Sequence, residues 1–181
     1  MKLHLLRHPK PMVASDVCYG ASDVPVADDE LERVAAALQA SGLPATLPVY
    51  ASPLQRCALL ARRLRPSDLR IDARLAEMHF GGWEMRAWSD IARAEVDAWA
   101  ADLLHYRPGG GENVLDVAHR VAAFLDHVRG AGTHAALVVC HAGTIRLMAQ
   151  LVLGSTPEQA GLAAARAAHR IAYGELVTLQ A

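Results

Sequence analysis

Residues 135–140 read Ala-Ala-Leu-Val-Val-Cys and predict a strand that is apolar on both faces. Such a strand has to be covered on both faces, which is typical of the centre of a parallel sheet. Further short strands are expected near Leu3 to Leu6, over Leu47 to Ser52, near Leu69 to Ile71 and over Glu175 to Leu179. Helical segments separate them. The pattern predicts an α/β fold of three layers, with a mostly parallel central sheet and helices on both faces.

The helical segments have apolar residues at helical spacing and recognisable ends. Negative charge at 28–30 marks the start of the first helix, and Ser52-Pro53 predicts a serine cap with proline at the first helical position of the second. The helices are expected from about Asp28 to Gly42, from Ser52 to Pro66, over Ala87 to Leu104, from about Glu112 to Val128, over Ile145 to Leu153 and over Ala163 to His169.

The length of 181 residues fits one domain over residues 1–181, and the sequence shows no internal repeat or linker. Aromatic residues make up only 5% of the chain, so Ala, Leu and Val have to build most of the core. The segment at about residues 77–108 precedes a glycine-rich loop and is expected to form a small helical cap insertion in this domain.

Charge and composition exclude several classes of partner. The 18 Lys and Arg residues against 19 Asp and Glu residues give a net charge of −1, so no basic field for nucleic acid is expected. No apolar stretch approaches the roughly 20 residues that span a bilayer. The three cysteines, Cys18, Cys57 and Cys140, lack zinc-like spacing, and their odd number favours a reducing, cytoplasmic location. The oligomeric state is open, with a homodimer as one option.

Polar side chains follow the strands where the strands end. Arg7 and His8 follow the first strand, Arg56 lies in the first turn after the second, and His141 follows the strand at 135–140. Ligand sites of open α/β sheets lie at the carboxyl ends of the strands. A guanidinium matches a phosphate, and a neutral imidazole can attack phosphorus. A loop after the third strand adds Glu77, so a phosphate-directed site is predicted at this edge.

Each of these residues also has an ordinary structural explanation: a surface arginine, a core histidine or a solvated glutamate. Glu84 is a second carboxylate in the loop of Glu77, and the choice between the two stays open. Tyr19 and Gly20 lie in a long irregular segment that is either an ordinary loop or a functional one. The run at 109–111 lacks the GKS or GKT of a phosphate-binding loop and is interpreted as a turn before a helix.

Four motifs make the sequence resemble the histidine phosphatase superfamily, whose best-known branch is the cofactor-dependent phosphoglycerate mutases. The motifs, in the family's order, are Leu6-Arg7-His8, Ser52-Pro53-Leu54-Gln55-Arg56-Cys57, Glu77 with Phe80-Gly81-Gly82-Trp83-Glu84, and Val138-Val139-Cys140-His141-Ala142-Gly143. The segments at 17–26 and 110–113 resemble the alpha-ribazole phosphatase branch. Two positions depart from the family pattern, because Pro9 and Met85 stand where glycine is common.

This resemblance implies a metal-independent mechanism without a cofactor. His8 would attack the phosphoryl group and become a phosphohistidine. Glu77 would protonate the leaving alkoxide and then activate the water that hydrolyses the intermediate. The resemblance further implies Arg7, Arg56 and His141 around the phosphoryl oxygens, and Tyr19, Gly20 and Ala142 against the substrate.

The function expected from this resemblance is hydrolysis of a small phosphorylated metabolite. The best single candidate is alpha-ribazole 5′-phosphate, in cobalamin nucleotide-loop assembly. A phosphoglycerate mutase-like phosphotransferase is the alternative, although such mutases are generally longer. Protein-phosphohistidine phosphatases lack the acid-bearing loop and the cap. A catalytically silent phosphate-binding relative would require Pro9 or Met85 to be disabling.

Overall fold

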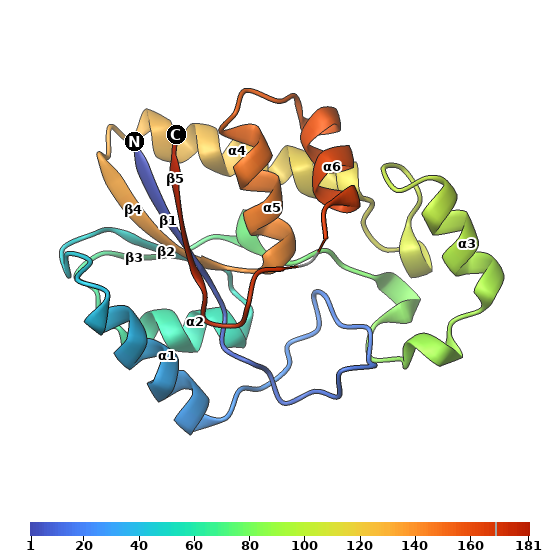
Figure 1. Cartoon of the computed structure of the whole chain (residues 1–181), viewed down its shortest axis with the longest axis horizontal. Helices are drawn as coiled ribbons and strands as arrows, with labels where there is room; N and C mark the ends of the chain where they lie inside the picture. Colours follow the sequence, from blue (N-terminus) through green and yellow to red (C-terminus); the bar gives the residue numbers. More distant parts are fainter. Residues whose placement is uncertain (169) are drawn as a thin grey trace.

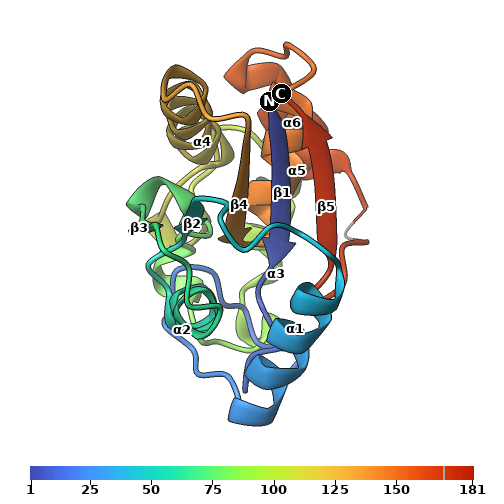
Figure 2. The same cartoon turned by 90° about the vertical axis from the view of Figure 1, so that its left-hand side faces the viewer.

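Across residues 1–168 and 170–181, which are the residues the structure describes, the computed structural model contains one five-stranded sheet (Figure 1). Its order is β3-β2-β4-β1-β5, as the strands follow one another in Figure 2. All neighbours are parallel except β5, which is antiparallel to β1. The mostly parallel sheet predicted from the sequence is thus confirmed. The strands are β1 (Lys2–Arg7), β2 (Val49–Ala51), β3 (Leu69–Ile71), β4 (Ala135–Cys140) and β5 (Leu176–Gln180).

Helices cover both faces of the sheet, which gives the three predicted layers. Figure 1 shows α4, α5 and α6 on one side of the strands and α1 and α2 on the other. The segment that carries α3 lies beside the sheet and not on either face. The helices are α1 (Asp28–Ala40), α2 (Gln55–Arg63), α3 (Arg93–Ala101), α4 (Val114–Gly130), α5 (Ala142–Leu151) and α6 (Pro157–Arg166).

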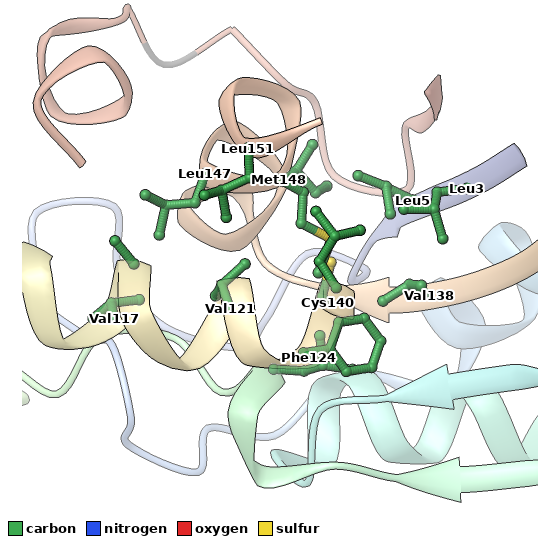
Figure 3. Close-up of a cluster of buried hydrophobic side chains, with 14 of the residues drawn as sticks. Leu3, Leu5, Val117, Val121, Phe124, Val138, Cys140, Leu147, Met148 and Leu151 are labelled. Atoms are coloured by element: carbon green, nitrogen blue, oxygen red, sulfur yellow. The ribbon is translucent and has the colours of Figure 1, made fainter. Parts of the chain in front are cut away.

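Strand β4 explains why its sequence is apolar throughout. Val138 and Cys140 pack into the cluster formed with α4 and α5, while Leu137 and Val139 point to the cluster formed with α1 and α2. Successive side chains of a strand face opposite sides, so a strand covered on both sides needs apolar residues at every position. Figure 3 shows the first cluster, where Phe124 of α4 lies near Val138.

The predicted serine cap of α2 is wrong. The helix begins at Gln55, its N-cap residue is Leu54, and Pro53 precedes the helix. The Ser52 hydroxyl accepts a hydrogen bond from the Leu54 N–H at 3.3 Å and also contacts Nε2 of His141 at 2.8 Å. The serine therefore organises the turn and a histidine from another strand end, which its local sequence does not reveal.

The segment predicted to be helical over 87–104 is divided in the structure. A 3₁₀ turn spans Trp88–Asp90, and α3 begins only at Arg93. Between them Ile91 is extended (φ −86°, ψ 128°) and packs its buried side chain near Trp83. The extended backbone at Ile91 interrupts the helix.

The last helix begins earlier than predicted. Helix α6 starts at Pro157, and its N-cap Thr156 forms a capping box with Gln159, a signal that is present in the sequence. Residue 169, the end of the predicted helix, lies outside the described residues. Within residues 1–168 and 170–181, no helix is both long and apolar enough to traverse a lipid bilayer.

Candidate active site

The structure brings the five predicted site residues together at the carboxyl edge of the sheet. Arg7 and His8 end β1, Arg56 lies in the first turn of α2, and Glu77 follows the 3₁₀ turn after β3. These four line a cleft of about 830 Å³. His141, the N-cap of α5, is fully buried, and its ring centroid lies 5.1 Å from that of His8. The parallel strand ends account for this convergence.

His8 is held as a neutral imidazole with one reactive nitrogen. Its Nδ1 lies 2.8 Å from the carbonyl oxygen of Pro9, and since a carbonyl can only accept, Nδ1 carries the proton. Nε2 therefore keeps its lone pair. Burial, and then the charges of Arg56 and Arg7, lower the pKa of His8 to about 3 against the opposing effect of the Pro9 hydrogen bond. The imidazole is neutral at physiological pH.

Backbone carbonyl groups fix the orientation of both arginines. Arg56 donates through one terminal nitrogen to the carbonyl of Ser22 at 2.7 Å and through the other to that of Gly20. Arg7 donates to the carbonyl of Ile171. The Nε of each arginine is buried and has no hydrogen-bond partner among the described residues. Both guanidinium groups are thus oriented while keeping unused hydrogen-bonding capacity.

The two arginines also lack a counter-charge. Within residues 1–168 and 170–181, neither Arg7 nor Arg56 forms an ion pair with a carboxylate. Arg56 is 0% exposed and Arg7 is 7% exposed. Buried charges without a partner are costly, so this site is electrostatically prepared to receive an anion.

His141 is neutral as well and is held from behind. Its Nε2 lies 2.8 Å from the Ser52 hydroxyl and 3.5 Å from Sγ of Cys57. Burial first, and then the neighbouring His8 and Arg56, hold the pKa of His141 well below its usual range. A neutral His141 adds no positive charge to the site, in contrast to Arg7 and Arg56.

Glu77 is fixed by the first turn of α5. Its Oε2 accepts a hydrogen bond from the Gly143 N–H at 3.1 Å. A Cβ at Gly143 would collide with this carboxylate, so only glycine allows the close approach. Arg120 of α4 donates to the main-chain carbonyls of Ala76 and Glu77 and pairs with Glu112, which holds the loop against α4.

Glu84, the competing carboxylate, does not line the cleft. It accepts hydrogen bonds from the N–H groups of residues 20–22 at 2.9–3.1 Å and from Phe80 at 2.9 Å. Burial raises the pKa of Glu84, but these bonds and the Ser22 hydroxyl outweigh it and hold the pKa below its usual value. Glu84 therefore anchors the loop whose carbonyls orient Arg56, and Glu77 is the carboxylate in the cleft.

The predicted substrate-contacting residues have different positions. Tyr19 and Ala142 line the cleft, whereas Gly20 lies behind it. A Cβ at Gly20 would collide with the carbonyl of Met78 and the ring of Phe80, which explains the glycine. Gly20 thus serves close packing beside Arg56.

The two departures from the family pattern are accommodated by the backbone. Pro9 provides the carbonyl that accepts from His8, a group that every residue type has. Met85 adopts φ of 62°, a left-handed conformation that favours glycine, and donates its N–H to the carbonyl of Cys18 at 2.7 Å. Its side chain is exposed.

Tyr173, in the segment before β5, also lines the cleft but is not among the residues predicted from the sequence. Its ring lies 3.8 Å from the guanidinium carbon of Arg7, and its hydroxyl lies 2.8 Å from that of Tyr19. No motif marks this residue, because its importance comes from contacts with residues more than 150 positions away.

One side of the cleft is aromatic. This side is lined by Phe80, Trp88 and Trp99, together with the aliphatic Leu103. The Trp88 and Trp99 rings are parallel within 4° with centroids 6.4 Å apart, and Phe80 meets both edge-on. In a chain with only 5% aromatic residues, this clustering places an aromatic surface in the same cleft as His8, Arg7 and Arg56.

The fold and this arrangement define a phosphatase of the histidine type. The family model of the histidine phosphatase superfamily (branch 1) matches residues 3–171, and the chain belongs to this superfamily. The adenosylcobalamin/alpha-ribazole phosphatase of Escherichia coli (strain K12) is 30% identical over 172 residues, covering 87% of this chain and 82% of that protein.

Solved structures agree with this assignment. The alpha-ribazole phosphatase from Shigella flexneri has a TM-score of 0.84 at 24% identity, covering 99% of this chain and 90% of that one. A putative alpha-ribazole-5′-P phosphatase from Escherichia coli K-12 has a TM-score of 0.81 at 26% identity, with 98% and 89% covered. The predicted superfamily, fold and phosphatase class are confirmed.

Proposed function

We propose that this chain hydrolyses a small phosphate monoester by transferring its phosphoryl group first to His8 and then to water. The observation that carries the proposal is a neutral imidazole, with a free Nε2 lone pair, beside two buried guanidinium groups that have no carboxylate partner in the described chain. An anion with several acceptor oxygens would compensate these charges and use their free donors.

In the first step Nε2 of His8 attacks phosphorus, so that an N–P bond forms while the ester P–O bond breaks. Arg7, Arg56 and His141 surround the phosphoryl oxygens and stabilise the charge spread over them in the transition state. Glu77, in its protonated form, gives its proton to the leaving oxygen, and the product alcohol departs.

In the second step the Glu77 carboxylate takes a proton from a water molecule as the water oxygen attacks phosphorus. The N–P bond breaks, inorganic phosphate forms and His8 recovers its lone pair, so the cycle returns every group to its starting state. The N–H of Gly143, 3.1 Å from the carboxylate, keeps Glu77 in place through both steps. We propose that this cycle needs no metal ion and no other cofactor.

We propose alpha-ribazole 5′-phosphate, in cobalamin nucleotide-loop assembly, as the substrate. The aromatic side chains of Trp88, Trp99 and Phe80 suit a leaving group that carries a planar apolar ring, and the similar proteins named above support this choice. Residues 77–108, which carry these side chains, would act as the cap over the leaving group. The thiols Cys18, Cys57 and Cys140 are free and buried, which supports a reducing, cytoplasmic location.

A second candidate is phosphotransfer between phosphoglycerates. Arg146 and Arg170 line the same cleft as the phosphate-directed residues and would suit the carboxylate of such a substrate. Phosphotransfer would return the phosphoryl group to a second hydroxyl and release little free phosphate.

The test is steady-state phosphate release in the presence of EDTA, with His8→Ala as the inactive control. The panel contains alpha-ribazole 5′-phosphate, 3-phosphoglycerate, sugar phosphates and p-nitrophenyl phosphate, with a coupled assay for phosphoglycerate interconversion. We expect the ribazole ester to have the highest kcat/KM. Interconversion without phosphate release would favour the second candidate, and a folded protein silent on every ester would identify a phosphate-binding relative without activity.

A further inference from the structure

Two tyrosines from distant parts of the chain meet at the cleft. The hydroxyls of Tyr19 and Tyr173 lie 2.8 Å apart, although 154 residues separate them. Tyr19 belongs to the loop that a bridge between Val17 and Ala87 ties to the cap segment, and Tyr173 belongs to the segment that leads into β5. Both side chains line the cleft.

Each tyrosine also lies against one of the two buried arginines. The guanidinium carbon of Arg7 is 3.8 Å from the centre of the Tyr173 ring, and that of Arg56 is 5.4 Å from the Tyr19 ring. These are cation–π distances. The Tyr173 ring centroid is 5.5 Å from that of His8. The two tyrosine rings therefore lie beside the two positive charges, and the Tyr173 ring also lies beside the His8 ring.

The pair has one hydroxyl proton more than it uses. Two tyrosine hydroxyls carry two protons, and their mutual hydrogen bond uses one. Either hydroxyl can donate in the bridge, and Tyr173 is the partner whose ring lies beside His8, so the productive arrangement has Tyr19 donating to the Tyr173 oxygen. The proton of Tyr173 then remains, and its hydroxyl has no other hydrogen-bond partner among the described residues.

We propose that Tyr173 is a further binding residue of the phosphoryl site, donating its hydroxyl proton to an oxygen of the bound phosphoryl group while Tyr19 holds that hydroxyl in position. The Tyr173 ring also lies on one face of the Arg7 guanidinium and helps to hold it in place. A second support for Arg7 is the carbonyl of Ile171, which accepts a hydrogen bond from a terminal nitrogen of Arg7. This inference rests on the proposed function, because it assumes a phosphate ester in the cleft.

The test compares Tyr173→Phe, Tyr19→Phe and the double variant with the wild type. Affinities for inorganic phosphate and orthovanadate are measured by calorimetry, together with KM and kcat. Tyr50→Phe is the matched control, because the buried Tyr50 hydroxyl also has one hydrogen bond, from Arg70 at 3.1 Å, and Tyr50 does not line the cleft. Thermal midpoints without ligand report any effect on folding alone.

We expect Tyr173→Phe to weaken phosphate and vanadate binding about tenfold, as expected for a lost hydrogen bond to a charged group. Tyr19→Phe should weaken it only two- to threefold and should add nothing in the Tyr173→Phe background, because the two hydroxyls act as one chain. Tyr50→Phe should leave both affinities unchanged.

Wild-type affinity in Tyr173→Phe, or independent effects of the two tyrosines in the double variant, would overturn the proposal. So would an equal loss in Tyr50→Phe. These outcomes differ from failure of the proposed function itself, in which the wild-type protein would bind neither phosphate nor vanadate and would release no phosphate from any ester.

Discussion

Nδ1 of His8 lies 2.8 Å from the carbonyl oxygen of Pro9, and this contact decides which imidazole nitrogen can react. The acceptor belongs to the main chain, so the tautomer does not depend on the residue type at position 9. Proline at this position is therefore compatible with the reactive form of His8, even though the family more often has glycine there.

The low pKa of His8 makes stability depend on pH. The folded protein has a His8 pKa of about 3, whereas an unfolded histidine titrates near 6.5. Between these values the unfolded chain binds a proton that the folded chain does not, so the free energy of unfolding decreases as pH falls below about 6.5. By pH 5.5 the titration of His8 lowers the free energy of unfolding by about 1.4 kcal/mol.

We therefore expect urea midpoints of the wild type to decrease more steeply between pH 7.5 and pH 5 than those of His8→Gln. Glutamine keeps a polar side chain but does not titrate. His141 also has a lowered pKa, but burial is the largest cause and is present in both proteins, so most of its slope cancels in the comparison. Parallel midpoint curves would show that His8 is not held neutral by the fold.

Substitution of Glu77 should affect esters according to their leaving groups. In Glu77→Gln, loss of the proton donor should slow the phosphorylation step by about 100-fold or more for an alkyl phosphate. The pre-steady-state burst with p-nitrophenyl phosphate should change little, because nitrophenolate leaves without a proton. Rapid-quench measurements on both esters decide this, and equal losses on both would assign Glu77 to binding.

Glu84→Gln, unlike Glu77→Gln, should reduce stability and should affect esters regardless of their leaving groups. Glu84 accepts hydrogen bonds from four main-chain N–H groups at 2.9–3.1 Å. Replacing this charged acceptor with the neutral glutamine should lower the free energy of unfolding by about 2 kcal/mol. Because the loop at 20–22 orients Arg56, KM should increase for both kinds of ester alike. Since the pKa of Glu84 is lowered, the stability difference from wild type should shrink as pH falls below about 4.5. Chemical denaturation at pH 7 and pH 4 tests the loss of stability and its pH dependence, and KM on both kinds of ester tests the effect on Arg56.

Met85→Gly should stabilise the protein by about 0.5–1 kcal/mol. The left-handed conformation at Met85 (φ 62°) costs a residue with a side chain about 1–2 kcal/mol, and glycine would remove this cost. The greater conformational freedom of glycine in the unfolded chain offsets part of that stabilisation. Met12 is the matched control, because it is also an exposed loop methionine but its φ is not positive. Met12→Gly should destabilise, and a lower thermal midpoint for Met85→Gly would contradict the argument.

The parts of the site that follow strands could be predicted from the sequence. Arg7, His8 and His141 come directly after apolar strands, and parallel strands bring their carboxyl ends to one edge whatever the details of packing. The bounds of β3 and β4 were also predicted as observed, because each is a short segment with apolar residues between turn signals. Local sequence was sufficient for these elements.

Residues that depend on contacts between distant segments could not be predicted. Ser52 has the local pattern of a helix cap, yet its hydroxyl contacts His141, 89 positions away. Tyr173 is positioned by the contact of its ring with Arg7 and by the hydrogen bond between its hydroxyl and that of Tyr19. The sequence also could not decide between Glu77 and Glu84 as the carboxylate in the cleft. Only the fold shows that the N–H groups of residues 20–22 donate to Glu84.

The central claim is a covalent phosphoryl group on His8, and the most direct test is to trap it. Protein mixed with p-nitrophenyl phosphate is quenched in alkali during turnover, and its peptides are analysed by mass spectrometry. We predict a phosphoryl group on His8 of the wild type, and neither this adduct nor turnover in a folded His8→Ala variant. Turnover by His8→Ala, or a turning-over wild type that is phosphorylated at another residue, would contradict the account.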